Sequence, residues 1–264
     1  MNLFFREMKS YRNSLFFWSL GMIALVAAGF AKYAAYQGTG QPMTAILDQF
    51  SKSMQAIFGI NGFDISKMSG FYGVMFMYFA LMATVHAVII GTDIIGKEER
   101  DRTSEFLMVK PISRSKIIFI KLFAGLINLI VLNIVTLFSS LYFVNYFGKG
   151  VAITKNIETL MIGLFALQLI FFFAGTAIAA ISKKQKTAPS TATFLLLITF
   201  VLSIFININT KLDWLKYLTP FRYFDARNLL STGFEPLYLT IATLAVAIFI
   251  LVTFRSFQKR DLSI

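Results

Sequence analysis

The chain has 264 residues, of which 57% are hydrophobic and only 14% are charged, and its mean hydropathy is +0.69. Because a soluble domain carries about 25% charged residues, this composition excludes an ordinary soluble enzyme and a disordered chain. The 25 Lys and Arg outnumber the 13 Asp and Glu, which gives a net charge of +12. Basic excess in so apolar a chain favours a membrane protein over a nucleic-acid-binding protein.

The N-terminal residues have the pattern of an amphipathic helix. Phe4, Met8 and Tyr11 recur at helical spacing, whereas Arg6 lies on the opposite side. Such a helix is suited to the membrane interface, where its cations face lipid headgroups. The sequence therefore predicts an N-terminal interfacial helix over residues 1–14, and the alternative is a basic flank on the first membrane span.

Six apolar stretches are long enough to cross a bilayer, whose hydrocarbon core requires about 20 residues of helix. They cover residues 15–36, 71–92, 117–144, 157–181, 188–206 and 237–254. We find no internal repeat and no low-complexity linker. The sequence therefore predicts an all-α polytopic membrane protein with six transmembrane helices, organised as a single transmembrane domain over residues 1–264.

Lys and Arg are distributed unequally between the two sides that these spans define. One side comprises residues 1–14, 93–116, 182–187 and the C-terminal tail. With Lys121 included, this side carries 16 basic residues, whereas the other side carries nine. Because the acids divide almost evenly, this side holds +9 of the net charge. Cytoplasmic loops are enriched in Lys and Arg, so we expect both termini in the cytoplasm.

The loop between the second and third spans, residues 93–116, has the densest charge in the chain. Its six basic and five acidic residues nearly cancel. Pro111 ends any helix before it, so residues 98–109 are predicted to form a short mixed-charge helix that carries Phe106 and Leu107. A polar helix with an exposed apolar pair is suited to docking into another protein, and the alternative is a solvated turn.

A second long segment, residues 209–236, is rich in aromatic residues around Pro220. Aromatic side chains gather at membrane–water interfaces, and irregular backbone at membrane depth must be covered by protein. We therefore expect short helices here that are either extracellular or re-entrant.

Ionisable chemistry is almost absent from the span interiors. His86 is the one ionisable residue well inside a span, whereas ion-coupled carriers usually place acids at mid-membrane. His86, Asn128, Asn133 and Gln168 are candidates for a translocation path, and the alternative is that they hydrogen-bond between helices.

The sequence also argues against catalysis by this chain. A stretch from Gly91 to Lys97 imitates a phosphate-binding loop, but Glu98 stands where Mg²⁺ requires Ser or Thr. With one His and no Cys, a His- or Cys-based metal site is not expected. We therefore expect no catalytic residue, no metal and no cofactor in this chain.

Residues 98–121 resemble the signature of ABC-2 type transporter permeases, in which acidic residues precede Gly-Thr-x-Glu, a Leu-rich stretch, Pro-(Val/Ile)-Ser-Arg and a later Lys. Arg102 replaces the usual Gly, and residues 217–224 are similar to the stretch before the last span of bacterial exporters in this group. The matching positions are Thr103, Glu105, Leu107, Pro111, Ser113, Arg114 and Lys121.

The resemblance implies a bacterial export permease, similar to antibiotic, peptide and sodium exporter permeases, in the cell membrane. Its partners would be two copies of an ABC ATPase subunit, which bind ATP and Mg, and a second permease that is identical or homologous. Membrane lipids would surround it, and we expect no nucleic acid. The implied ATPase-coupling residues are Glu98, Glu99, Arg102, Thr103, Glu105, Phe106, Leu107, Pro111 and Arg114.

The resemblance further implies outward transport, and aromatic, Met-rich spans would suit hydrophobic or amphipathic cargo such as a peptide, antibiotic or lipid. The alternative function is a membrane immunity or sensor subunit that binds a toxic peptide without moving it.

Overall fold

The computed structural model describes residues 3–38, 50–60, 62–101, 113–148 and 153–259, which contain helices and no strand. Six helices are long and apolar enough to cross a membrane. Each of the six predicted spans lies within one of them, so the prediction of an all-α protein with six spans is confirmed. They are α1 (Leu3–Gly38), α4 (Met68–Arg100), α6 (Arg114–Phe147), α7 (Thr154–Ile181), α8 (Ala188–Ile208) and α11 (Pro236–Lys259).

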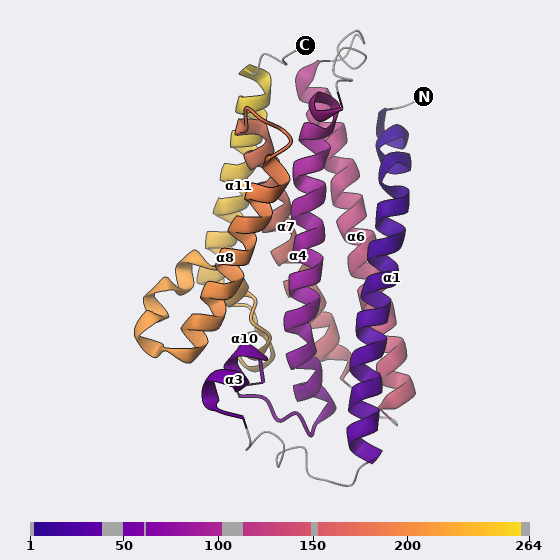
Figure 1. Ribbon diagram of the computed structural model, residues 1–264, viewed down its shortest axis with the longest axis vertical. Helices are drawn as coiled ribbons and strands as arrows, with labels where there is room; N and C mark the ends of the chain where they lie inside the picture. The colour runs from indigo at the N-terminus through magenta and orange to yellow at the C-terminus, as the bar shows by residue number, and fades with distance from the viewer. Residues whose placement is uncertain (1–2, 39–49, 61, 102–112, 149–152, 260–264) are drawn as a thin grey trace.

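The long helices run roughly side by side in one bundle (Figure 1). Helix α4 lies in the middle, with α1 and α6 on one side of it and α8 and α11 on the other. The two ends of the chain lie at the same end of the bundle, which we call the terminal end. This arrangement is what an even number of spans requires.

The most extensive helix pairing is that of α4 with α7, and it depends on glycine. A Cβ atom on Gly91 would lie 2.3 Å from the carbonyl oxygen of Phe172, and one on Gly175 would lie 2.9 Å from that of Val88. Small residues let helix backbones approach closely in a membrane, where lipid offers no hydrophobic driving force between helices. The two glycines therefore bring the backbones of α4 and α7 into direct contact.

The N-terminal residues differ from the prediction. Residues 3–14 are not a separate interfacial helix, because they form the first turns of α1, which continues unbroken to Gly38. Tyr11 is buried, and Phe4 and Met8 pack against the same apolar cluster of α4 and α6 residues. The segment is therefore helical and has the predicted apolar side, but this side packs against the chain's own helices rather than against lipid.

Within the described residues, four short helices connect the long ones at the end opposite the termini (Figure 1). Phe221 packs on Phe171 of α7, with ring centroids 5.2 Å apart, and on Phe200 of α8 at 5.1 Å. The aromatic residues of the 209–236 segment thus attach it to the bundle. The four are α3 (Lys52–Ile57), η1 (Thr210–Leu218), α9 (Pro220–Tyr223) and α10 (Ala226–Ser231).

Only the beginning of the helix predicted over residues 98–109 can be compared with the structure. Glu98, Glu99 and Arg100 belong to the last turn of α4, which ends there. Residues 102–112 lie outside the described part of the chain.

Candidate functional site

A buried group of charges joins α1, α4 and α6 near the terminal end; we call Arg6, Glu7, Lys97, Glu98 and Lys121 the ionic cluster. The Lys121 side chain is only 1% exposed. Its Nζ lies 2.7 Å from both carboxylate oxygens of Glu98 and donates to the carbonyl oxygen of Ile94 at 2.7 Å. Lys121 therefore ties the end of α4 to the first turns of α6, across the loop between them.

Glu7 adds α1 to this arrangement. Its carboxylate is fully buried, 2.5 Å from Lys97 Nζ and 3.8 Å from Lys121 Nζ. Arg6, which is partly exposed, reaches both acids at 3.4 Å from Glu7 and 3.5 Å from Glu98. The cluster thus contains three cations and two carboxylates, and every member has an opposite charge nearby.

A second layer of polar contacts extends the ionic cluster toward the surface. Tyr11 of α1 donates to Asp93 of α4 at 2.9 Å, and Lys97 lies over the Tyr11 ring at 4.6 Å. Arg100 pairs with the other oxygen of Asp93 at 2.5 Å. The contacts of Tyr11 fix the first turns of α1 against the last turns of α4 at the terminal end.

Burial gives the ionic cluster its energetic importance. Removing a charge from water costs several kcal/mol, and only close pairing with hydrogen bonds offsets that cost. Lys121 meets this requirement, because its ammonium group has Glu98, Glu7 and a backbone carbonyl around it. Loss of one partner would leave an uncompensated buried charge, so α1, α4 and α6 are held together tightly at this level.

Glu98 and Arg114, both predicted coupling residues, contact other parts of this chain. Glu98 is 8% exposed and directs its carboxylate to Lys121. Arg114 donates to the carbonyl oxygen of Gln258 at 3.1 Å, and Gln258 donates to Ser115 at 2.8 Å, which joins the first turn of α6 to the end of α11. Glu99 is partly buried in the last turn of α4. The others, Arg102, Thr103, Glu105, Phe106, Leu107 and Pro111, lie outside the described residues.

Glu7 was not among the predicted site residues, although its position in the sequence could have identified it. Glu7 lies three residues after Phe4 and four before Tyr11, so it shares the apolar side of the helix. A carboxylate on the apolar side of a helix needs a buried cation as its partner. Lys121 is a candidate for that cation, because it lies one turn inside the third predicted span. The structure shows that the two meet.

The four polar candidates in the spans do not form one group. Asn133 of α6 donates to Gln168 of α7 and to the carbonyl oxygen of Met161, both at 3.2 Å. Asn128 donates to the carbonyl oxygen of Ala124 in its own helix at 2.8 Å. His86 is fully buried, and neither ring nitrogen has a hydrogen-bond partner among the described residues. Only Asn133 and Gln168 are therefore brought together, and a path through all four stays a prediction.

His86 has an aromatic neighbour instead. Its ring centroid lies 5.3 Å from that of Trp18 in α1, at a tilt of 58°. The pair adds a contact between α1 and α4 further along the helices from the ionic cluster.

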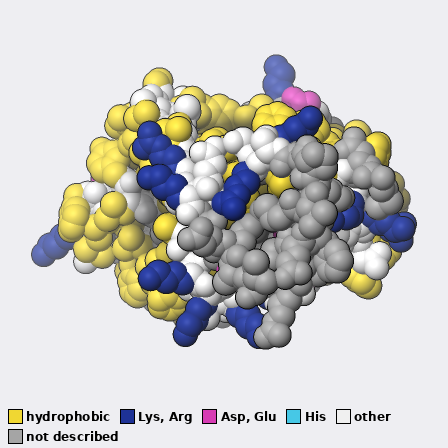
Figure 2. Space-filling view, turned by 90° about the horizontal axis from the view of Figure 1, so that it is seen from above, with side chains coloured by type: hydrophobic (Ala, Val, Ile, Leu, Met, Phe, Trp, Pro, Cys, Tyr) yellow, Lys and Arg dark blue, Asp and Glu magenta, His cyan; other side chains and the backbone are white. Residues whose placement is uncertain are grey.

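Most of the charged side chains visible on the surface of the terminal end are basic (Figure 2). Lys and Arg are spread around its rim, and few acidic side chains are visible there. The turn between α7 and α8 contributes exposed Lys183, Lys184 and Lys186, and the end of α11 contributes exposed Arg255 and Lys259. The acids that the structure describes at this end mostly form ion pairs with cations of α1, α4 and α6.

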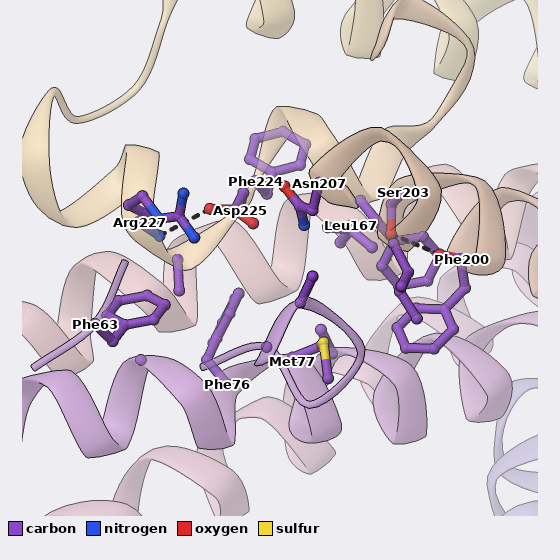
Figure 3. Close-up of a pocket in the computed structure, with 17 residues that line it drawn as sticks. Phe63, Phe76, Met77, Leu167, Phe200, Ser203, Asn207, Phe224, Asp225 and Arg227 are labelled. Atoms are coloured by element: carbon purple, nitrogen blue, oxygen red, sulfur yellow. Dashed lines mark hydrogen bonds between the residues drawn. The ribbon is translucent and has the colours of Figure 1, made fainter. Parts of the chain in front are cut away.

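The opposite end contains a small cavity of about 50 Å³ between the short helices and the bundle (Figure 3). Asp225 accepts from the backbone N–H of Arg227 at 2.9 Å, which caps α10, and the Arg227 guanidinium lies 5.8 Å from the Phe63 ring. This volume is far below the roughly 300–1,000 Å³ range of small-molecule sites, so the cavity is too small for organic cargo. It therefore belongs to the packing of the short helices.

A partly exposed ion pair lies in η1 at this same end. Lys216 donates to Asp213 at 2.8 Å. The hydrogen bond holds the pKa of the Asp213 carboxyl below its usual value and raises the pKa of Lys216.

Comparison with known proteins identifies the family. A family model described as ABC-2 family transporter protein matches residues 1–262, nearly the whole chain. The chain is also similar to the uncharacterized protein YhcI of Bacillus subtilis (strain 168), with 25% identity over 209 residues, which are 70% of this chain. It spans 66% of that relative, a little under two thirds of its length. The chain therefore belongs to the ABC-2 family of transporter proteins and is a multi-pass membrane protein.

Proposed function

We propose that this chain is the transmembrane permease subunit of an ABC exporter in a bacterial cell membrane. It moves hydrophobic or amphipathic cargo outward, and a separate ATPase subunit supplies the energy by binding ATP with Mg and hydrolysing it. Membership of the ABC-2 family supports a permease role. The lack of an enzyme's motifs in the sequence agrees with a subunit that depends on another chain for its energy.

The observation that carries the proposal is the position of the ionic cluster. Residues 102–112 connect the last turn of α4 to the first turn of α6, and Lys121, about two turns into α6, links the two helices close to this loop through Glu98. A partner that pulled or pushed this loop would therefore displace both helices together. Because Glu7 is in the same cluster, α1 would move with them.

The remaining helices are coupled to α4 by close packing. The backbone contact at Gly91 and Gly175 makes α7 follow any tilt of α4, since neither helix can slide past the other without a clash. Arg114 and Gln258 similarly join the start of α6 to α11. A displacement at one loop would in this way reach most of the bundle.

The orientation and the partners follow from charge and family. The basic rim of the terminal end would lie in the cytoplasm by the positive-inside rule, together with both termini and the 102–112 loop. Two such permeases, identical or homologous, would each receive one ATPase subunit on this side. Mixed charges in the loop would provide specificity, and Phe106 with Leu107 would provide the buried anchor.

The experiment that tests this function measures ATP hydrolysis in the complex. The permease is co-expressed with a candidate ABC ATPase from the same genome, purified, and placed in lipid vesicles. We expect the two chains to co-purify and the permease to raise the hydrolysis rate. An ATPase that neither binds nor responds would contradict the proposal.

A catalytically dead ATPase separates the exporter from an immunity or sensor subunit. Cells that export a toxic peptide lose their protection when ATP hydrolysis is abolished. A subunit that only binds the peptide would keep protecting them.

A further inference from the structure

A groove runs along the outside of the bundle between α6 and α7, well separated from the ionic cluster. Its volume is about 510 Å³, which lies within the roughly 300–1,000 Å³ range of small-molecule sites. Its apolar lining consists of Ile130, Ile134 and Leu137 from α6 and Met161, Ile162 and Phe165 from α7. Several of these side chains are substantially exposed, so the groove is open to the membrane.

One carboxylate lies at one end of this groove. Glu158 belongs to the first turns of α7, at the end of the bundle opposite the termini, and its side chain is exposed. It makes no ion pair or hydrogen bond with any residue in the described parts of the chain. Lys155, one turn earlier on α7, is also exposed and is not within ion-pair distance of it. Because Glu158 is exposed at the outer end of the span, its carboxylate is accessible to a cation that enters the membrane interface.

The other polar group of the groove is already satisfied. The Asn133 amide donates both to Gln168 and to the carbonyl oxygen of Met161, which fixes its orientation. Apart from the carboxylate of Glu158, the side chains that line the groove are therefore uncharged. This asymmetry selects a molecule that has a positive charge at one end and an apolar body along the rest.

We propose that the α6–α7 groove binds a cationic amphiphile, in which an ammonium group pairs with Glu158 and an apolar chain lies between the two helices. Phe165 lies seven positions after Glu158, which is a rise of about 10 Å along α7, so a single alkyl chain can follow the groove. Identification of this amphiphile as cargo rests on the proposed transport function, whereas its binding does not.

The test uses 12-bromododecylamine as the probe and 12-bromododecanol as its neutral counterpart. Phe165 is replaced by Trp, and Trp18 and Trp214 by Phe, in the full-length protein in zwitterionic lipid vesicles. Bromine quenches a nearby indole, so quenching reports an alkyl chain in the groove. We expect the amine to quench at about tenfold lower concentration than the alcohol, the effect of one charge-assisted contact.

Two variants isolate the contribution of Glu158. Glu158→Gln is expected to remove the preference for the amine. Glu235→Gln removes one negative charge at the same end of the bundle, outside the groove, and is expected to keep the preference. Because both variants lose one charge, general attraction of the amine to the protein surface cancels between them.

Several outcomes would overturn the inference. Equal quenching by amine and alcohol would mean that the groove holds only ordinary lipid chains. An unchanged preference in Glu158→Gln, or an equal loss in Glu235→Gln, would mean that Glu158 does not bind the ammonium group. Native mass spectrometry of the unaltered chain with dodecylamine or dodecanol repeats the comparison without Trp replacements, and equal retention there would overturn it too.

This test is independent of the proposed function. If the amine binds through Glu158 but no ATPase associates with the chain, the site stands and the exporter proposal fails. If an ATPase drives transport but the amine does not bind, the exporter proposal stands and this inference fails alone.

Discussion

Lys121 of α6 lies 2.7 Å from both carboxylate oxygens of Glu98 in α4, although 23 residues separate the two along the chain. The pair closes the base of the loop that is predicted to meet an ATPase. The pair is also buried, so water cannot replace either side chain as the partner of the other. This relationship makes the ionic cluster the part of the protein where a local change should have the largest effect.

Replacement of Lys121 by Met should destabilise the protein by about 3–5 kcal/mol, because Glu98 and Glu7 would lose a buried counter-charge. Replacement of both partners, Glu98→Leu with Lys121→Met, should recover most of this stability. Thermal unfolding of the purified protein in detergent measures both effects. Lys186→Met, an exposed charge at the same end, is the control and should change stability by less than about 0.5 kcal/mol. Equal stabilities of the single and double variants would contradict the role of the pair.

Cysteine cross-linking should show that the first turns of α1 pack on α6. The ring centroids of Phe4 and Phe123 are 5.7 Å apart, and the chain has no natural Cys. Phe4→Cys with Phe123→Cys should therefore cross-link efficiently in membranes with a short bifunctional reagent. Lys9→Cys with Phe123→Cys should not, since Lys9 is exposed on the other side of α1. Similar yields from both pairs would indicate an N-terminal segment detached from the bundle.

Gly91→Ala should disrupt the contact between α4 and α7. Its new methyl group would meet the carbonyl oxygen of Phe172 at 2.3 Å, and backbone cannot move aside as a side chain can. We expect a loss of about 1–3 kcal/mol in unfolding free energy, the usual cost of overpacking. Gly21→Ala is the matched control, because its methyl would meet only the flexible end of Met82 at 2.8 Å. If the two substitutions proved equally harmless, the close crossing of α4 and α7 would be refuted.

Substitutions in the loop should separate coupling from folding. Glu105→Lys or Phe106→Ala is expected to leave the protein folded, with unchanged thermal unfolding, and to abolish stimulation of the partner ATPase. Phe16→Ala, which removes an exposed ring on α1, is the control and should leave stimulation intact. Unchanged ATP hydrolysis and transport in both loop variants would refute the coupling role of the loop.

The six spans could be predicted from sequence because hydrophobicity along about 20 consecutive residues is a local property. The helix at the N-terminus was predicted for the same reason, since the spacing of Phe4, Met8 and Tyr11 follows the helical period. Its surroundings could not be predicted in this way. A helix with one apolar side can cover lipid or protein, and the periodicity is the same in both cases.

The charged residues illustrate the same division. Lys121 and Glu98 both stood out in the sequence, one as a cation inside a span and the other as part of the family signature. Their pairing depends on how α4 and α6 lie against each other, which is a relation between distant segments. The Glu7 contact with Lys121 spans 114 positions of sequence and brings in a third helix.

By itself, the sequence determined the class of protein, the number of spans and the family, because composition, local hydrophobicity and a short motif carry that information. The sign and distribution of its net charge also determined the expected orientation. Only the tertiary structure decided that α1 is one continuous helix, that Glu7 and Glu98 share Lys121, and that α6 and α7 leave a groove beside Glu158. These features arise from contacts between helices, whose free energy depends on three-dimensional packing rather than on the order of residues within any one segment.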